Sequence, residues 1–342
     1  MEIQSNHSLI NFNTMHLSCE SEFYFKLQNF EDLMFLKNYI NKKSCSYFIM
    51  GGGSNILLPE VYEGLIIHNH LLGISKLIYR DEDLEPNYFL IRAMAGVIWD
   101  DFVAITIESG WYGLENLSLI PGTVGASPIQ NIGAYGVEVK DFIEYVECFD
   151  LNTGHTIKIA NKDCNFSYRN SRFKKEPNLL VTAVVFRLKK VPELNISYGD
   201  IATKMAQIQN PTARDLRSCI IETRKNKLPD PKIISNVGSF FHNPILTNEK
   251  IEKLKLEYPD LPVYKVDESF SKVSAGWLID NVGFKGFKYK NVGVYDKQAL
   301  VLVNYSASSR NEILELAAII QDTILTKYGI TLNIEPIKVS GY

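Results

Sequence analysis

A triple glycine that ends a short apolar stretch is the first feature of this chain with clear chemical potential. Glycine lets the backbone approach a bound group closely, and consecutive N–H groups can converge on phosphate oxygens. Neighbouring polar side chains add donors, so the candidate set is Gly51, Gly52, Gly53, Ser54 and Asn55. A glycine-rich turn alone is more often only a tight turn, and this one opens no helix, as a GxGxxG dinucleotide motif must.

A second glycine-rich segment, residues 119–137, is too rich in helix and strand breakers for either element, and a long loop inside a compact domain is usually functional. Its first half offers small residues and free amides that suit a pyrophosphate at Gly122, Thr123, Val124, Gly125, Ala126 and Ser127, and Pro121 belongs to the same candidate cofactor site. Gln130 and Asn131 can hydrogen-bond a heteroaromatic ring, while Gly133, Ala134 and Gly136 leave room for a flat one. The two segments together predict a dinucleotide, with isoalloxazine as the best-fitting ring.

Bulk composition excludes several other classes of protein. The 342 residues are 46% apolar, enough for a large core in two or three domains. A formal charge of -3 provides no polycationic surface for nucleic acid or anionic lipid. The 5 cysteines are scattered, without a CxxC pair or clustered histidines, which favours reduced thiols in a cytosolic protein and no metal site. The N-terminus lacks a basic and then apolar segment, and no apolar run reaches about 18 residues, so we expect neither secretion nor membrane insertion.

The elements that must position these segments are mixed strands and helices, which indicates an α+β fold. A βαβ-like opening is expected, with strands at 23–27 and 47–50 around a helical pattern at 33–40. Further strands are predicted at 56–58, 64–68, 74–79, 88–95, 143–149, 179–188 and 299–304, with a last one around Ile334. Helices are predicted at 97–109, 213–225, 248–258 and 275–281, and a long one opens with a Ser309 to Glu312 capping box and closes at Gly329.

Six blocks of sequence in order then carry a resemblance to a known family. They read MGGGSNILL (50–58), GLENLSLIPGTVGASPIQNIGAYGVE (113–138), SYRNSRFK (167–174), KLPDP (227–231), NVGSFFHNP (236–244) and AGWLID (275–280). Together they resemble UDP-N-acetylenolpyruvoylglucosamine reductase, also called UDP-N-acetylmuramate dehydrogenase. The similarity runs from about residue 13 to residue 335, and the SYGD segment at 197–200 resembles the longer form with a tyrosine-bearing loop.

The resemblance implies a flavin-binding module of the vanillyl-alcohol-oxidase (PCMH) type in two subdomains, plus a third α+β substrate-binding domain. The flavin module is expected at 13–190, split near 70–75, and a connecting segment with the substrate loop and a helix at 191–226. The substrate-binding domain is expected at 227–320, and residues 321–342 are expected to return to the active site. Neither glycine segment contains histidine or cysteine, the residues that attach flavin covalently in some oxidases, so we expect non-covalent FAD.

In the reaction implied by the resemblance, NADPH reduces FAD, and flavin N5 then gives a hydride to the terminal methylene carbon of a UDP-linked enolpyruvyl sugar. Ser239 matches the proton donor to the adjacent carbon; without the family match it reads as a small turn residue beside Gly238. Arg169 matches the arginine that faces the substrate carboxylate, where a planar guanidinium can clamp both oxygens; its alternative is a surface ion pair.

The C-terminal motif departs from the family, which usually ends in a stretch like LEPEVR where this chain reads LNIEPI (332–337). A gapless alignment places the second family glutamate on Glu335, whereas alignment of the EP dipeptides places Ile337 there and loses the carboxylate. Either alignment leaves the family's arginine unmatched. We prefer Glu335, because a buried carboxylic acid with a raised pKa can share a hydrogen bond with an enolate.

By the same resemblance, five residues contact the substrate: Tyr168, Tyr198, Lys227, Asn243 and Gln298. Closure of the tyrosine loop would exclude water from the flavin. Two alternatives remain at this point: an FAD-dependent oxidase of the same superfamily, which would lack NVGSFF, and a nucleotide-sugar binding protein that has lost catalysis. We expect a cytoplasmic monomer that binds neither nucleic acid nor membrane.

Overall fold

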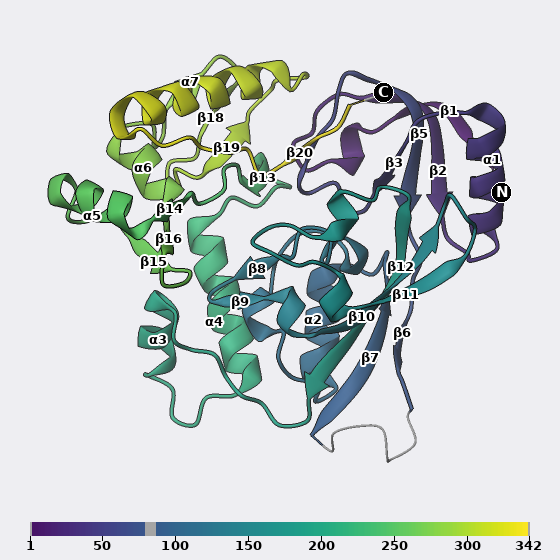
Figure 1. The fold of residues 1–342 in the computed structure, drawn as a ribbon, viewed down its shortest axis with the longest axis horizontal. Coiled ribbons are helices and arrows are strands. Elements are labelled where there is room, and N and C mark those ends of the chain that lie inside the picture. Colours follow the sequence, from purple (N-terminus) through teal and green to yellow (C-terminus); the bar gives the residue numbers. More distant parts are fainter. Residues whose placement is uncertain (1, 79–86, 341–342) are drawn as a thin grey trace.

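The computed structural model describes residues 2–78 and 87–340 and has the expected α+β architecture. Three groups of strands follow one another along the chain, each with its own helices (Figure 1). The boundaries between the domains remain a prediction.

The first sheet is four-stranded, in the order β1-β2-β5-β3. Its strands β2, β5 and β3 run parallel, and α1 provides the crossover from β2 to β3, which confirms the βαβ opening. The antiparallel edge strand β1 was not predicted. The elements are β1 (Gln4–Ser8), β2 (Glu20–Leu27), α1 (Asp32–Lys43), β3 (Tyr47–Met50) and β5 (Val61–Asn69).

The second sheet is five-stranded, in the order β11-β10-β12-β7-β6, and every pairing in it is antiparallel. Its long central strand β12 is apolar and buried along most of its length, as a strand covered on both faces must be. The elements are β6 (Ile74–Lys76), β7 (Tyr88–Met94), α2 (Trp99–Glu108), β10 (Ile143–Asp150), β11 (Thr156–Ala160) and β12 (Leu179–Lys189), with the small hairpin β8 (Gly133–Ala134) and β9 (Val137–Glu138) in the second glycine segment.

Two helices, α3 (Gly199–Met205) and α4 (Ala213–Lys227), lead to the C-terminal region, residues 228–340. This region holds a four-stranded sheet, β13-β19-β18-β17, and a three-stranded sheet, β14-β16-β15. The elements are β13 (Ser235–Ser239), β14 (Ile245–Thr247), α5 (Asn248–Glu257), β15 (Val263–Lys265), β16 (Phe270–Val273), α6 (Ala275–Asn281), β17 (Lys288–Tyr289), β18 (Val292–Val294), β19 (Val301–Asn304) and α7 (Asn311–Tyr328).

After α7 the chain crosses back to the N-terminal part of the molecule, as the yellow segment in Figure 1 shows. There β20 (Ile337–Lys338) pairs in parallel with β4 (Ile56–Leu57), the strand that directly follows the first glycine segment. The guanidinium of Arg310 fastens this crossing by donating to the carbonyls of Leu57 and Val339. The crossing therefore brings the end of the chain to the first glycine segment.

Most predicted elements are confirmed within one or two residues, and four expectations need correction. Ser309 and Glu312 form no capping box: α7 has no side-chain N-cap, and the Glu312 carboxylate accepts instead from Asn291. The last strand lies at Ile337–Lys338, and Ile334 makes only an isolated bridge. Helix α3 begins at Gly199, inside the SYGD segment, where only a loop was predicted. The predicted strand at 74–79 ends at Lys76, and Tyr79 lies outside the described residues.

Apolar packing unites the first two sheets in one core, which runs from Phe25 on β2 to Phe186 on β12. The C-terminal region has a core of its own around α7, to which Met15, Leu17 and Leu57 of the N-terminal part contribute.

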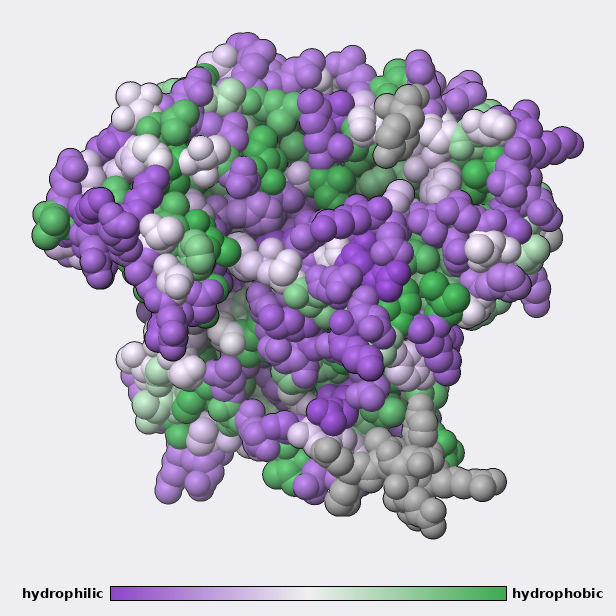
Figure 2. Space-filling model, in the orientation of Figure 1, coloured by the Kyte–Doolittle hydropathy of each residue, from purple (hydrophilic) through white to green (hydrophobic). Residues whose placement is uncertain are grey.

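On the face shown in Figure 2, hydrophilic residues cover much of the surface and hydrophobic ones lie in separate small groups. All 5 cysteines are free thiols. Within the described residues, no helix combines the length and apolar character that a membrane crossing requires.

Candidate active site

The two glycine segments predicted to hold a dinucleotide lie against each other. A Cβ atom on Gly51 would stand 2.6 Å from the Thr123 hydroxyl, and one on Gly52 would stand 2.9 Å from Cα of Gly122. The Ser54 hydroxyl donates to the Pro121 carbonyl at 3.1 Å. These contacts leave no space for side chains, so the glycines allow the two backbones to meet.

The amides at this junction fit a phosphate group. Within the described part of the chain, the N–H groups of Gly52, Gly53 and Ser54 have no acceptor, and neither do those of Gly122 and Thr123. Gly53 adopts φ 62°, a left-handed conformation that glycine tolerates at little cost. The junction thus presents two rows of unpaired donors, as a pyrophosphate cradle requires.

Four of the amides expected to be free are not. Residues 124–126 form a 3-10 turn, so Ala126 N donates to Thr123 O and Ser127 N to Val124 O. Val124 N donates to Val97 O and Gly125 N to Ala95 O, both at 2.9 Å, and a Cβ on Gly125 would lie 2.5 Å from that of Ala95. The prediction of free amides at these positions was wrong, because two of them close the turn and two bond to the residues that follow β7.

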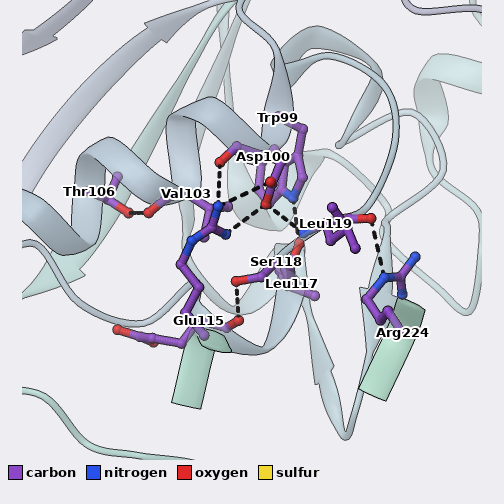
Figure 3. A network of polar contacts seen from close by, with 10 residues as sticks. Trp99, Asp100, Val103, Thr106, Glu115, Leu117, Ser118, Leu119 and Arg224 are labelled. Carbon is purple, nitrogen blue, oxygen red and sulfur yellow. Dashed lines mark hydrogen bonds and ion pairs between the residues drawn. The ribbon is translucent and has the colours of Figure 1, made fainter. Parts of the chain in front are cut away.

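Helices α2 and α4 hold the entry to the second glycine segment in place. Leu119 has φ 58°, which a leucine rarely adopts, and its N–H donates to the Asp100 carboxylate at 2.5 Å. The Leu119 carbonyl accepts from Arg224 Nε at 3.2 Å, and Arg217 donates to both Asp100 oxygens at 2.7 and 3.0 Å. Figure 3 shows Asp100 and Arg224 approaching Leu119 from two helices. This network fixes the backbone two residues ahead of Pro121.

Burial and hydrogen bonds have opposite effects on the pKa values of the carboxyl groups around this loop. Burial would raise the pKa of Asp100, but the bonds from Arg217 and Leu119 lower it overall, below its ordinary value of 3.8. On the same loop, the buried carboxylate of Glu115 accepts from the Gly113 N–H, and burial raises its pKa.

Arg169 connects the second half of the glycine segment to the C-terminal crossing. Its Nη2 donates to the Gly133 carbonyl at 2.6 Å and its Nη1 to the Asn131 carbonyl at 3.4 Å. Its Nε lies 3.3 Å from Oε1 of Glu335. Arg169 itself has φ 53°, a strained conformation for a non-glycine residue, which is typical of residues held for a functional purpose.

Glu335 lies two residues before β20, and its backbone N–H donates to the Phe240 carbonyl at 2.9 Å. Its Oε1 accepts from Gln130 Nε2 at 2.8 Å. Burial raises the pKa of Glu335, and the cations of Arg169 and Lys174 oppose that rise without cancelling it. Ile337, the alternative in the other alignment, packs in the small core between β20 and the N-terminal sheet. The carboxylate of the C-terminal segment therefore meets Arg169 and Gln130, and Ile337 does not.

Ser239 is the last residue of β13 and pairs with Val301 on β19, just beyond an irregularity in the register. Its neighbour Phe240 contacts both adjacent segments, donating to the Leu300 carbonyl and accepting from the Glu335 N–H. Ser239 is partly exposed, and among the described residues its hydroxyl makes no hydrogen bond. The hydroxyl is available to a ligand, next to the residue whose carbonyl accepts from the Glu335 N–H.

Tyr168 and Asn243, expected at the substrate, contact each other, since Asn243 N donates to the Tyr168 hydroxyl at 3.3 Å. The Tyr168 ring lies between two cations, with Lys272 Nζ 4.4 Å and the Arg169 guanidinium 5.3 Å from its centroid. The Asn243 side chain accepts from Ala275 N, the start of α6. Gln298 lies near this group, at the turn before β19, and its Oε1 accepts from Leu300 N at 3.3 Å.

Tyr198 and Lys227 belong to a second, more exposed group. The Tyr198 ring meets Tyr135 edge-on at 5.4 Å, and burial together with the neighbouring Tyr264 hydroxyl raises the pKa of Tyr198 to about 12. Lys227 pairs with Asp200 at 2.6 Å, next to Tyr198 in sequence. The tyrosine segment thus touches both the second glycine segment, through Tyr135, and the C-terminal region, through Tyr264.

Comparison with known proteins decides the family. Residues 22–160 match the model of an FAD binding domain, and residues 230–339 match the C-terminal domain of UDP-N-acetylenolpyruvoylglucosamine reductase. The reductase of that name from Bdellovibrio bacteriovorus is 44% identical over 99% of this chain and 100% of its own length. The chain belongs to the UDP-N-acetylenolpyruvoylglucosamine reductase family.

Other members agree with this assignment. The reductase from Neisseria gonorrhoeae is 43% identical over 95% of this chain and 94% of its own. The crystal structure of the reductase from Thermus caldophilus superposes with a TM-score of 0.67 over 99% of this chain and 98% of that one, at 20% identity, which shows the shared fold. This family member is accordingly an FAD-dependent oxidoreductase, with an FAD-binding domain in its N-terminal part. Membership of the reductase family replaces the alternative of an FAD-dependent oxidase.

Four residues that contact predicted site residues were missed by the sequence analysis: Tyr135, Lys174, His242 and Lys272. Lys174 Nζ donates to the Arg169 carbonyl at 2.7 Å, and His242 Nδ1 lies 3.6 Å from Oε2 of Glu335. Tyr135, Lys174 and His242 stand inside the sequence blocks that carry the family resemblance, which was the signal available for them. Nothing in the spacing of Lys272 marked it.

Proposed function

We propose that this protein reduces the enolpyruvyl ether of UDP-N-acetylglucosamine to UDP-N-acetylmuramate, a step in the synthesis of peptidoglycan precursors. FAD, held by the two glycine segments around Gly52 and Gly122, would supply the hydride chemistry, with NADPH as the source of the hydride and the terminal methylene carbon of the substrate as its acceptor. That carbon becomes a methyl group, and the electron pair of the former double bond is left on the adjacent carbon and its carboxylate. The protein must stabilise this charge and supply one proton.

Ser239 is proposed to supply that proton. A serine hydroxyl is a weak acid, so it protonates only a strongly basic carbon that is held close in a water-poor pocket. The free hydroxyl of Ser239 supports this role: it lies at the end of β13, next to Phe240, whose carbonyl accepts from the Glu335 N–H. Its bond to hydrogen breaks as the new C–H bond forms.

Arg169 and Glu335 are proposed to stabilise the negative charge. Arg169 is fixed by two backbone carbonyls of the glycine segment, so its remaining donors need no reorganisation as charge develops. Glu335, in its protonated form, donates a hydrogen bond to the enolate oxygen, and the burial that raises its pKa favours that form. These two side chains join the flavin segment to the C-terminal crossing.

The UDP portion is proposed to lie along Tyr168, Asn243, Lys272, Tyr198 and Lys227. Aromatic rings beside cations suit a uracil ring next to a pyrophosphate. Contact of Tyr198 with both Tyr135 and Tyr264 supports closure of the tyrosine segment over the substrate. Gln298, at the turn before β19, is proposed as a polar contact near Ser239.

One observation carries the proposal: the convergence of Arg169, Gln130 and Glu335, which come from three distant parts of the chain. The test is to incubate the purified, FAD-loaded protein with NADPH and the enolpyruvyl substrate and to follow product by mass spectrometry. UDP-N-acetylglucosamine, which lacks the enolpyruvyl group, is the control. Formation of UDP-N-acetylmuramate supports the proposal, and an intact substrate with a fully loaded protein contradicts it, as a binding protein would predict.

The remaining expectations, a cytoplasmic location and a monomeric state, stay predictions.

A further inference from the structure

The two oxygens of the Glu335 carboxyl group have different surroundings. Oε1 faces donors only: Gln130 Nε2 at 2.8 Å and Arg169 Nε at 3.3 Å. Both are N–H groups that require an acceptor lone pair. Oε2 instead faces His242, whose Nδ1 lies 3.6 Å away. A proton on this carboxyl group therefore belongs on Oε2, because Oε1 accepts a hydrogen bond from Gln130 and lies in an ion-pair contact with Arg169.

His242 has an unused ring nitrogen at this position. Its Nδ1 is buried and has no hydrogen-bond partner among the described residues. The backbone holds the residue in place, since His242 N donates to the Asn333 carbonyl at 2.9 Å, and the Tyr168 ring meets the imidazole edge-on at 5.9 Å. A buried nitrogen without a partner is costly, so a function for it is expected.

The charges around His242 determine whether it donates or accepts. Besides Glu335, the charged groups that face it are Lys174 and Arg169, and Tyr168 is the neighbouring titratable ring. Burial, with the two cations, lowers the pKa of His242 to about 4. The imidazole is therefore neutral at neutral pH, which excludes a His242–Glu335 ion pair and makes Nδ1 an acceptor once the proton sits on Nε2.

We propose that His242 is a positioning residue that accepts the proton of Glu335 in a hydrogen bond from Oε2 to Nδ1 and so holds Glu335 as the neutral acid. The separation of 3.6 Å between these two atoms is too long for a hydrogen bond, and a side-chain movement of about half an ångström brings them within range. No proton is transferred to His242. The inference rests on the proposed role of Glu335 as a hydrogen-bond donor to the enolate: His242 holds the Oε2 proton before the substrate reacts, and the O–H turns from Nδ1 to the enolate oxygen as negative charge develops there.

The consequence is a carboxylic acid with a fixed orientation. Arg169 and Lys174 favour the carboxylate, whereas burial and a hydrogen-bond acceptor on Oε2 favour the acid. Removal of the acceptor should shift this balance toward the carboxylate. The pKa of Glu335 should then fall by about one pH unit, the equivalent of one hydrogen bond.

The test measures the protonation of Glu335 directly, in FAD-loaded protein. Infrared difference spectra of the carboxylic acid C=O stretch are recorded against pH, with Glu335→Gln used to assign the band. His242→Phe keeps a planar ring without an acceptor, and His242→Leu is a second variant if the first does not fold. His242→Gln retains an acceptor oxygen, and His155→Leu, on the β10–β11 hairpin, is the matched control.

We expect the Glu335 band to disappear about one pH unit lower in His242→Phe than in the wild type. His242→Gln should lie between the two, and His155→Leu should match the wild type. An unchanged pKa of Glu335 in both His242→Phe and His242→Leu overturns the inference.

Kinetics separate this inference from the proposed function. In His242→Phe the alkaline limb of the pH profile for flavin reoxidation by the enolpyruvyl substrate should move by the same amount, while reduction by NADPH is unchanged. If Glu335→Gln turns over normally yet His242→Phe shifts the band, the hydrogen bond stands and the role of Glu335 fails. If Glu335→Gln is crippled but the band does not move, only the role of His242 fails.

Discussion

The junction of the two glycine segments allows a prediction with its own internal control. Gly51→Ala and Gly52→Ala each add a single methyl group, and neither glycine has a positive φ, so only space is at issue. The methyl group on Gly51 meets a side chain, the Thr123 hydroxyl at 2.6 Å. The one on Gly52 meets backbone, Cα of Gly122 at 2.9 Å. The first clash can be relieved by a second substitution and the second cannot.

The expected size of the effect follows from these distances. Real Cβ contacts shorter than about 3 Å do not persist, so the segments must separate, and overpacking of this kind costs about 1–3 kcal/mol. If the cost falls on the state that binds FAD, affinity should drop by roughly tenfold to a hundredfold. Thr123→Ala removes Oγ1 and leaves Cβ at 3.8 Å from the added methyl group, an ordinary contact.

The assay is a titration of cofactor-free protein with FAD, followed by quenching of flavin fluorescence. Gly51→Ala should weaken binding about tenfold, and the Gly51→Ala, Thr123→Ala double variant should return to within about twofold of Thr123→Ala alone. Thr123→Ala should not rescue Gly52→Ala. Urea unfolding of each cofactor-free variant serves as the control for general loss of stability.

Wild-type FAD affinity in Gly52→Ala would refute the view that the two segments form one cradle. Rescue of Gly52→Ala by Thr123→Ala would also contradict it, because the Thr123 side chain does not face that position.

Two further predictions concern Arg169 and Asp100. Arg169→Lys keeps the positive charge but loses the planar set of donors that reaches Gly133 and Glu335. Reoxidation of the flavin by the enolpyruvyl substrate, followed by stopped flow, should therefore slow about 100-fold, while reduction of the flavin by NADPH is unaffected. Equal slowing of both half-reactions would contradict this prediction. Asp100→Asn should lower the free energy of unfolding by about 2 kcal/mol, because Arg217 loses its buried partner. The pKa of Asp100 is lower in the folded protein than in the unfolded one. The stability that Asp100 contributes is therefore present above its unfolded pKa and is lost as the pH falls through its folded pKa. Urea unfolding measured from pH 7 to acid pH should show that the wild type loses free energy of unfolding more steeply than Asp100→Asn.

Local patterns predicted most of the elements, because their signals are short-range. The bounds of β3 and α6 match their predicted ranges, and Gly329 ends α7 with φ 60°, as a glycine C-cap does. The capping box failed because Glu312 has a better partner in Asn291, about twenty residues earlier in the chain. Helix α3 was missed because tertiary packing stabilises it and no local pattern marks it: Ile201 and Met205 pack on Leu216 and Ile220 of α4.

The sequence allowed individual site residues to be proposed, but it did not predict which of them contact one another. Gln130 and Glu335 are 205 positions apart, and they meet because the end of the chain pairs with β4 and bonds to Phe240 and His242. Gln130 was expected to contact the ring, yet its amide donates to Glu335, and the Asn131 amide donates to Glu138 and to the Ser167 carbonyl. Such side-chain partners depend on the fold and leave no pattern in the local sequence.

The central claim is that Ser239 donates the proton that completes the reduction of the enolpyruvyl group. It is tested most directly by anaerobic stopped-flow spectroscopy of Ser239→Ala, with FAD bound, through addition of NADPH and then of the enolpyruvyl substrate. We predict that the flavin absorbance bleaches with NADPH at the wild-type rate and does not recover with the substrate. Recovery at the wild-type rate, or equal loss in both steps, would contradict the account.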